Sequence, residues 1–286
     1  MRNIEIYAFS DEAGMDLDSQ IAAMLRNGIA GPELRGVDGQ NISDISPDKA
    51  REIRSRLSDA GLRVRALGSP IGKISLADDF TAHLDRLRRT VDIARALDCG
   101  RIRMFSFYPA EGQRAEDMRS QVLDQTGAML DACEGSGVAL CHENEKGIYG
   151  DTAARCLELL TAEPRLRAVF DPANFVQCGQ DTLEAWVMLR DRVDYLHIKD
   201  AFFADGRVAP AGRGEGHVPE IVADYLARGG TAMTVEPHLA VFEGLDALER
   251  EGRRSGIDSF TYASVGEAFD AACAALRKIL EEAYIP

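Results

Sequence analysis

Four chemically active side chains follow short apolar runs in the second half of the chain. Glu143 ends VALCHE, Asp171 ends AVFD, His197 lies in YLHI and Glu236 ends MTVE. The spacing between consecutive members is roughly that of one strand plus one helix. If the runs are neighbouring parallel strands, their carboxyl ends meet at one edge and the four side chains converge. Three carboxylates and an imidazole form a ligand set for Mn²⁺, Mg²⁺, Co²⁺ or Zn²⁺.

The run CHENEKGIYGD at 141–151 places several charges directly after an apolar strand. A charge that is desolvated without a partner costs several kcal/mol. A divalent cation shared by Glu143, Asp171 and Glu236 would neutralise this cluster, and without it at least one carboxylate would take up a proton. His142 and Glu145 belong to the same run, and we expect them to support the site rather than to ligate the ion.

A repeated pattern of helix, glycine and β-branched run supplies the elements that position these residues. A glycine at this point ends a helix through a left-handed residue. Two further strands, at 166–171 and 193–198, follow helices without such a glycine, and IEIYAF at 4–9 begins the series, which gives eight strands. The helix-ending glycines are Gly28, Gly61, Gly100, Gly137 and Gly230.

The helices of this series also carry start and packing signals. Ser46 before Pro47 is a serine cap with proline in the first turn. Asp181 or Thr182 caps the helix that begins LEAW. The last helix carries an apolar stripe, which we expect to pack on the strands. This stripe is formed by Phe269, Cys273, Leu276 and Leu280.

Alternating strands and helices predict parallel strands joined by right-handed crossovers. Eight such units predict one closed (β/α)8 TIM barrel over 1–286, a single α/β domain. The alternative is an open doubly wound sheet, but no GxGxxG follows the first strand. The longest irregular segment runs from Pro237 to about Ala263, and a connection of that length suggests a lid or a subunit contact.

Composition limits the partners. A net charge of −14 disfavours nucleic-acid binding, and no apolar run reaches membrane-spanning length. The N-terminal residues lack the apolar core of a secretory signal. The six cysteines form no CxxC pair, which favours reduced thiols in a cytoplasmic protein. We therefore expect a small-molecule ligand, and a homo-oligomer is plausible because of the long irregular segment.

Five motifs together resemble the xylose isomerase-like TIM barrel superfamily of the sugar phosphate isomerase/epimerase type. They are ENEKGIYGD, FDPANF, YLHIKD, GRGEGH and TVEPHL, and the likeness is strong over roughly 138–240. SDEAG, ELRGVDG and SPIGK, at the first three strand ends, match more loosely. That superfamily includes ketose 3-epimerases, inosose-processing enzymes and, more distantly, endonuclease IV. The resemblance implies one metal ion held by Glu143, Asp171, His197 and Glu236, with Glu143 and Glu236 also serving as catalytic acid and base.

Two positions depart from the ketose epimerases. Asn174 and Tyr195 stand where many of those enzymes have histidine. Both lie where substrate hydroxyls would be recognised, so Asn174 is a candidate substrate contact. The metal assignment is unaffected, but the identity of the substrate cannot be transferred from the family.

Lysine is rare in this chain, and its placement is selective. Three of the five lysines, Lys73, Lys146 and Lys199, come just after predicted strand ends. We expect them to bind substrate oxygens or a phosphate, or to balance the acids. Lys199 shares strand parity with His197, whereas Asp200 would face outward as a cap or an ion-pair partner.

Two loop residues complete the candidate substrate contacts. Arg213, in AGRGEGH, could bind an anion, and His238, in EPH, could line the pocket. His217, in GEGH, could equally line the pocket or shape its loop.

Such a site supports three reactions. A cation holding a ketone oxygen and a neighbouring hydroxyl acidifies the adjacent C–H, and a carboxylate removes that proton to give an enediolate. Return of a proton to the opposite face is epimerisation, and return to the neighbouring carbon is isomerisation. Loss of a β-hydroxyl is dehydration. We predict a metal-dependent isomerase or epimerase of a small ketose, sugar phosphate or keto-polyol, with a dehydratase of a keto-inositol-type substrate as the alternative.

Two other classes fit less well. An endonuclease IV-like phosphodiesterase would need a histidine-rich cluster of three metals, and the chain has only five histidines and a charge of −14. A barrel that binds a sugar or metal without turnover is disfavoured by the acid–base pair across the ion.

Overall fold

Eight parallel strands close into a barrel in the computed structural model, which describes residues 4–242 and 262–283. Around the barrel the strands follow the order β1-β12-β9-β8-β7-β6-β5-β2. This closure confirms the predicted TIM barrel and excludes the open sheet. The barrel strands are β1 (Glu5–Ala8), β2 (Gly31–Leu34), β5 (Ala66–Gly68), β6 (Arg101–Met104), β7 (Ala139–Glu143), β8 (Arg167–Phe170), β9 (Val193–Ile198) and β12 (Ala232–Val235).

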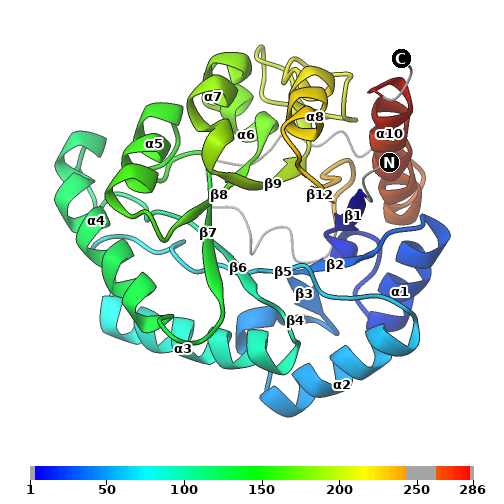
Figure 1. Cartoon of the computed structure of the whole chain (residues 1–286), viewed down its shortest axis with the longest axis horizontal. Helices are drawn as coiled ribbons and strands as arrows, with labels where there is room; N and C mark the ends of the chain where they lie inside the picture. Colours follow the sequence, from blue (N-terminus) through cyan, green and yellow to red (C-terminus); the bar gives the residue numbers. More distant parts are fainter. Residues whose placement is uncertain (1–3, 243–261, 284–286) are drawn as a thin grey trace.

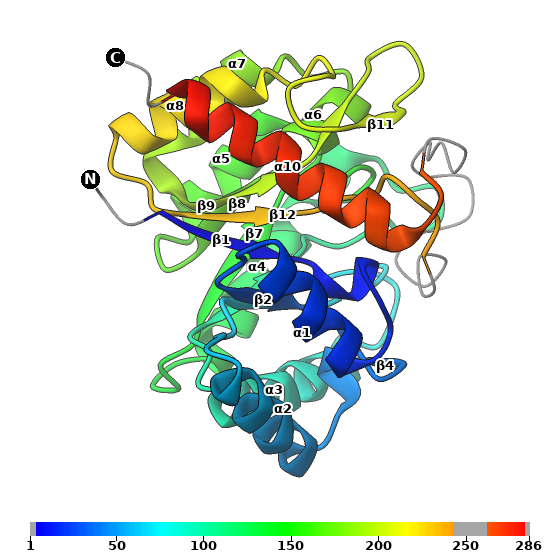
Figure 2. The ribbon, with the colours of Figure 1, turned by 90° about the vertical axis from the view of Figure 1, so that its right-hand side faces the viewer.

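Helices surround the barrel as an outer ring (Figure 1). The last of them, α10, packs beside α8 and α1 and covers β12 (Figure 2). None of the described helices is long and apolar enough to cross a membrane. The described α-helices are α1 (Leu17–Arg26), α2 (Pro47–Asp59), α3 (Phe80–Ala96), α4 (Ala115–Ala132), α5 (Ala153–Ala162), α6 (Pro172–Gln177), α7 (Thr182–Leu189), α8 (Val218–Ala227) and α10 (Val265–Ala283).

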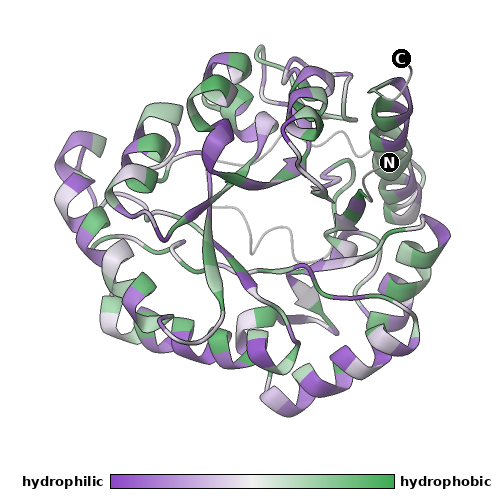
Figure 3. Ribbon diagram, viewed as in Figure 1, coloured by the Kyte–Doolittle hydropathy of each residue, from purple (hydrophilic) through white to green (hydrophobic). Residues whose placement is uncertain are grey.

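The predicted caps form. Ser46 accepts a hydrogen bond from the Lys49 N–H with Pro47 in the first turn of α2, and Asp181 caps α7 by accepting from the Glu184 N–H. Hydrophobic and hydrophilic residues alternate along the ring helices (Figure 3). On α10 the predicted apolar stripe, Phe269, Cys273, Leu276 and Leu280, is buried.

Two short hairpins extend the strand ends. The pair β3 (Gly36–Val37) and β4 (Gln40–Asn41) follows β2, and the pair β10 (Asp200–Ala201) and β11 (Val208–Ala209) follows β9. Most of the predicted irregular segment from Pro237 to Ala263 lies outside the described residues.

A buried layer fills the barrel interior below the carboxyl ends of the strands. Because alternate residues of each strand point inward, this layer draws one side chain from each of six strands. It separates the carboxyl-end mouth of the barrel from the amino-end mouth. Its members are Tyr7, Ala66, Cys141, Val169, Tyr195 and Ala232.

Candidate metal centre

The four side chains singled out by strand position converge at the carboxyl end of the barrel. Glu143 ends β7, Asp171 follows β8, His197 lies on β9 and Glu236 follows β12. One ligand atom from each lies within 4.8 Å of the others, and all four residues are buried. Adjacent strands in register, with Thr234 opposite His197, hold the group at one height.

Asp171 is fixed by the start of helix α6. Its Oδ1 accepts the Asn174 N–H at 3.1 Å as the helix cap. Asn144 locks the same backbone, because its amide donates to the Asp171 carbonyl and accepts the Asp171 N–H, each at 2.9 Å. Oδ1 is thus engaged by the helix start, and Oδ2 lies 2.9 Å from the Lys199 ammonium.

The His197 ring lies between three carboxylates. Its Nδ1 is 2.8 Å from Glu143 Oε1 and 3.4 Å from Glu236 Oε2, while Nε2 is 3.1 Å from Glu33 Oε2. Burial disfavours the charged ring, but Glu143 and Glu33 outweigh it and hold the pKa of His197 well above its ordinary value. The edge-on ring of Phe9, 5.1 Å away, packs against the imidazole.

Basic side chains oppose the carboxylates. Lys199 Nζ lies 2.9 Å from Asp171 Oδ2 and 3.3 Å from Glu236 Oε2. The Arg103 guanidinium lies 3.3 Å from Glu143 Oε2 and 3.9 Å from Glu33 Oε1. These buried charges partly neutralise a site that would otherwise be strongly repulsive.

The acids differ in proton affinity. Burial, reinforced by Glu236 and Glu143 and opposed by Lys199, raises the pKa of Asp171 to about 7. Burial also acts on Glu236, but Lys199, His238 and His197 overcome it and hold the pKa of Glu236 well below its usual range. Glu236 is therefore ionised at neutral pH, whereas Asp171 gains or loses its proton close to pH 7.

The residues fit a divalent cation. Asp171 Oδ2 and Glu236 Oε2 are both buried, and their positive partner is the Lys199 ammonium at 2.9 and 3.3 Å. Three buried carboxylates and one imidazole, each with a ligand atom within 4.8 Å of the others, form a donor set in which a divalent ion would take over much of this charge balance. One nitrogen and three oxygen donors suit Mn²⁺, Mg²⁺, Co²⁺ or Zn²⁺.

A second acidic group shares Glu236. Glu12, Glu236 and His238 also place ligand atoms within 4.8 Å of one another. The Arg35 guanidinium occupies this side, however, at 3.0 Å from Glu12 Oε1 and 3.8 Å from Glu236 Oε1. His238 Nδ1 lies 3.0 Å from Glu12 Oε1 and 3.4 Å from Glu236 Oε1. Because Arg35 already supplies positive charge, this group is better suited to orient Glu236 than to hold a second ion.

The candidate substrate residues are placed unevenly. Lys73 pairs with Glu145 at 3.0 Å, and Lys146 Nζ lies 3.4 Å from Gln177 Oε1. Asn174 stands at the cluster itself, where its amide lies 3.4 Å from Glu143 Oε1. Arg213 lies elsewhere: it is exposed and borders a hollow formed with the outer helix α10.

Asp200, in the hairpin after β9, is not placed as predicted from the sequence. Asp200 is fully buried rather than facing outward, and no ion pair to it is found in the described residues. Its carboxylate accepts backbone N–H groups from Gly212, Gly214 and Gly216 at 2.8 to 2.9 Å. Asp200 therefore folds the loop that carries Arg213. His217 shapes the same loop, since its Nδ1 meets Thr182 Oγ1 at 3.0 Å.

His142 and Glu145 stand outside the four-residue cluster. His142 Nε2 lies 2.9 Å from Ser106 Oγ, and burial lowers the pKa of His142 to about 3. Burial opposes ionisation of Glu145, but Lys73, Lys199 and Lys146 outweigh it and lower the pKa of Glu145 to about 2.

Sequence reasoning missed four buried charged residues. Each lies on, or just after, one of the strands that the first half of the chain contributes. The available signal was a charge in the middle of a strand: Glu33 lies within GPEL and Arg103 within RIRM. Strand parity turns both inward once the first residue of each strand is known. The missed residues are Glu12, Glu33, Arg35 and Arg103.

The family model for xylose isomerase-like TIM barrels matches residues 21–251. The chain belongs to this family. Comparison with curated protein sequences finds no significant match.

Solved structures share the fold at low sequence identity. A zinc-bound IolI protein superposes with a TM-score of 0.75 at 13% identity, over 99% of this chain and 100% of the other. An L-ribulose 3-epimerase gives 0.73 at 18% identity, over 99% and 96%. A probable 3-DHS dehydratase, AsbF, from Bacillus anthracis gives 0.72 at 17% identity, over 96% and 99%. At this identity the likeness establishes the barrel, and the activity has to be argued from the site.

Proposed function

We propose that this protein is a divalent-metal-dependent isomerase or epimerase of a small ketose, sugar phosphate or keto-polyol, working by proton abstraction through an enediolate. The observation that carries the proposal is the convergence of Glu143, Asp171, His197 and Glu236, all buried and each with a ligand atom within 4.8 Å of the others. One divalent ion bound there would polarise a substrate carbonyl and acidify the neighbouring C–H.

The chain's own residues supply the proton transfer. Glu143 and Glu236 enter from β7 and β12, which β8 and β9 separate, so the two carboxylates approach the centre from different sides. The depressed pKa of Glu236 keeps that carboxylate ionised at neutral pH, which is the form a general base needs. Lys199, beside Asp171 and Glu236, can stabilise negative charge that develops on the substrate oxygen. Such a pair can invert a carbon or shift a carbonyl.

Substrate recognition follows from the groups around this centre. Asn174, beside Glu143, can donate to a substrate hydroxyl in place of the histidine found in many ketose epimerases. Lys73 and Lys146 lie beside Glu145 and Gln177 and offer charge to an oxyanion or a phosphate. The exposed Arg213 could reach a substrate only through movement of its loop.

A dehydratase is the second candidate, and His238 favours it. Its Nδ1 lies 3.4 Å from Glu236 Oε1, so an imidazole, the side chain most used for proton transfer, stands beside the proposed base. One fold neighbour is described as a probable 3-DHS dehydratase. Dehydration would use the same proton abstraction and differ only in losing the β-hydroxyl.

The decisive experiment has two stages. Stripped protein is titrated with Mn²⁺, Co²⁺, Mg²⁺ and Zn²⁺ by calorimetry, with Glu236→Gln and Asp171→Asn as variants. Glu116→Gln, an exposed change of the same chemistry on α4, is the control. The loaded protein is then incubated with a panel of ketoses and keto-polyols in D₂O, and proton NMR follows loss of a substrate C–H signal.

We expect one ion per chain, weakened by both site variants and not by the control. Exchange with a new diastereomer indicates epimerisation, an aldose indicates isomerisation, and an unsaturated product indicates the dehydratase. Metal binding without exchange on any substrate would reject an enzyme of this class for the panel tested. No metal binding would overturn the proposal itself.

A further inference from the structure

A second hollow, of about 660 Å³, opens at the amino ends of the strands, across the barrel from the metal centre. Arg101 begins β6 and Arg167 begins β8, while Asp194 is the second residue of β9. Arg65 and Thr231 stand just before β5 and β12. The buried interior layer that contains Tyr7 and Tyr195 separates this hollow from the four-residue cluster. A ligand here would therefore be distinct from the proposed substrate.

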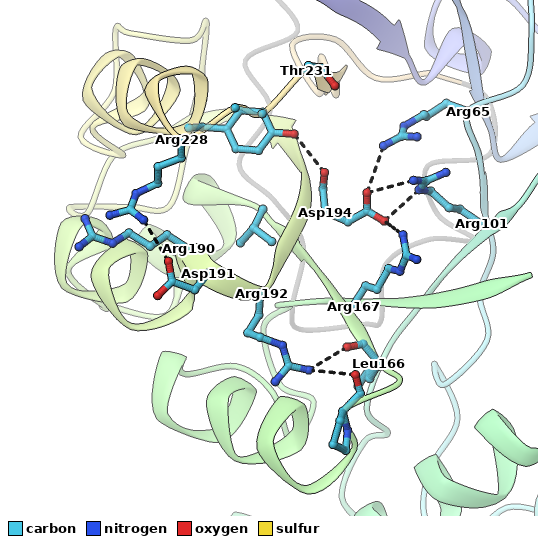
Figure 4. Close-up of a pocket in the computed structure, with 15 residues that line it drawn as sticks. Arg65, Arg101, Leu166, Arg167, Arg190, Asp191, Arg192, Asp194, Arg228 and Thr231 are labelled. Carbon is cyan, nitrogen blue, oxygen red and sulfur yellow. Dashed lines mark hydrogen bonds and ion pairs between the residues drawn. The ribbon is translucent and has the colours of Figure 1, made fainter.

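Arginine dominates the wall of this hollow (Figure 4). Six guanidinium groups stand against only two carboxylates in the lining, Asp191 and Asp194, with Asp224 behind them. Even with Asp224 included, about three positive charges remain unmatched, in a protein whose net charge is −14. The six are Arg65, Arg101, Arg167, Arg190, Arg192 and Arg228.

The arrangement around Asp194 concentrates this charge. Arg101 and Arg167 each approach Asp194 Oδ2 at 2.9 Å, and Arg65 approaches Oδ1 at 3.3 Å. One carboxylate thus gathers three guanidinium groups (Figure 4). The Asp194 side chain is 11% exposed while that of Arg167 is 50% exposed, so the acid is covered and guanidinium nitrogen faces the solvent.

The opposite wall of the hollow also carries more positive than negative charge. Arg192 donates to the backbone carbonyls of Pro164 and Leu166, and within residues 4–242 and 262–283 no ion pair to it is found. Arg190 and Arg228 share Asp224, and Arg228 also reaches Asp191 at 3.0 Å. The positive groups therefore border the hollow from both sides.

If these six arginines served only to stabilise the first residues of the strands, we would expect each to pair with an acid, because unpaired like charges repel one another. We propose that this amino-end hollow binds a small anion carrying two or more phosphate groups. Guanidinium groups bind phosphate through paired N–H donors, and several converging on one concave site favour a multiply charged ligand over a single phosphate. The volume admits a diphosphate or a phosphorylated metabolite of similar size.

The test is calorimetric titration with inorganic pyrophosphate at low ionic strength, on the full chain as purified. Arg167→Gln and Arg228→Gln remove one exposed guanidinium from each wall, and Asp194 keeps Arg65 and Arg101 in the first variant. Arg165→Gln is the matched control, because Arg165 pairs with Asp131 and Glu163 and does not line the hollow. Asp171→Asn serves as a second control, since pyrophosphate could also withdraw a metal from the other mouth. Thermal melts check that each variant is folded.

We expect saturable binding of one pyrophosphate per chain, weakening with added salt and at least about tenfold weaker in Arg167→Gln and in Arg228→Gln. Arg165→Gln and Asp171→Asn should bind as the parent does. Absence of binding in the parent would overturn the proposal, as would an equal loss in Arg165→Gln, which would mean unspecific surface attraction. If the heat of pyrophosphate binding disappears only in Asp171→Asn, the pyrophosphate is chelating a metal at the other mouth of the barrel. That result would also overturn the proposal. None of these outcomes depends on whether the protein is an isomerase.

Discussion

Glu33 Oε2 lies 3.1 Å from Nε2 of His197, the ring nitrogen that points away from Glu143 and Glu236. A carboxylate on the far nitrogen fixes the orientation and tautomer of a metal-binding histidine and strengthens it as a ligand. Glu33 is itself held, since it accepts the Tyr195 hydroxyl at 3.0 Å through Oε1. Tyr195 thus stands beneath the metal centre rather than in contact with the ligand atoms.

Replacing Glu33 by Gln should weaken metal binding about 10- to 100-fold, because the amide neither holds the His197 ring in one tautomer nor strengthens it as a ligand. Tyr195→Phe should have a smaller effect in the same direction, because it removes only the support of Glu33. Calorimetry with Mn²⁺ measures both. Equal metal affinity in Glu33→Gln and the parent would mean that Glu33 does not position the ring.

The four-residue cluster was readable from sequence because each side chain ends, lies in or directly follows an apolar strand, so barrel geometry alone brings the four together. Glu33 and Arg103 were not readable in the same way, because each interrupts its strand and its inward direction depends on where that strand begins. The prediction that Asp200 faces outward was wrong for a related reason. Strand parity turned it outward, but β9 ends at Ile198, and the short hairpin that follows places the carboxylate under three glycine amides.

Lys199→Met should lower the free energy of unfolding of metal-free protein by about 3–5 kcal/mol, since it leaves the buried Asp171 and Glu236 carboxylates without their nearest cation. A divalent ion should restore more stability to this variant than to the parent, because it supplies the missing charge. Urea unfolding with and without Mn²⁺ measures the difference. Lys278→Met, on the exposed face of α10, is the control and should change little. If Mn²⁺ raises the free energy of unfolding equally in Lys199→Met and in the parent, Lys199 does not contribute charge to the candidate metal centre.

Asp200→Asn should loosen the loop over 210–217, because one carboxylate oxygen becomes an amide donor that faces backbone N–H groups. Loss of these buried bonds should cost about 2–4 kcal/mol of unfolding free energy. The freed loop should also expose the chain after Arg213 to trypsin, so limited proteolysis followed by mass spectrometry detects the change. Asp205→Asn alters only exposed contacts with Arg207, a turn bond to its N–H and an ion pair at 3.8 Å, and should leave cleavage after Arg213 unchanged. Equal resistance of Asp200→Asn and the parent would contradict this role for Asp200.

His83 should make the fold sensitive to acid. Its Nε2 accepts the Gly72 N–H at 2.8 Å, which requires the neutral ring, and burial lowers the pKa of His83 from 6.5 to about 4. Between pH 4 and pH 6.5 the unfolded chain binds more protons than the folded one. The contribution of His83 to the free energy of unfolding is therefore fully present above about pH 6.5, decreases as the pH falls, and is lost below about pH 4. The contribution at stake is about 3 kcal/mol. His83→Gln keeps an acceptor for Gly72 without a titrating group, so urea unfolding from pH 7.5 to 4 should show a shallower decline. A decline as steep as that of the parent would mean that other groups govern the loss.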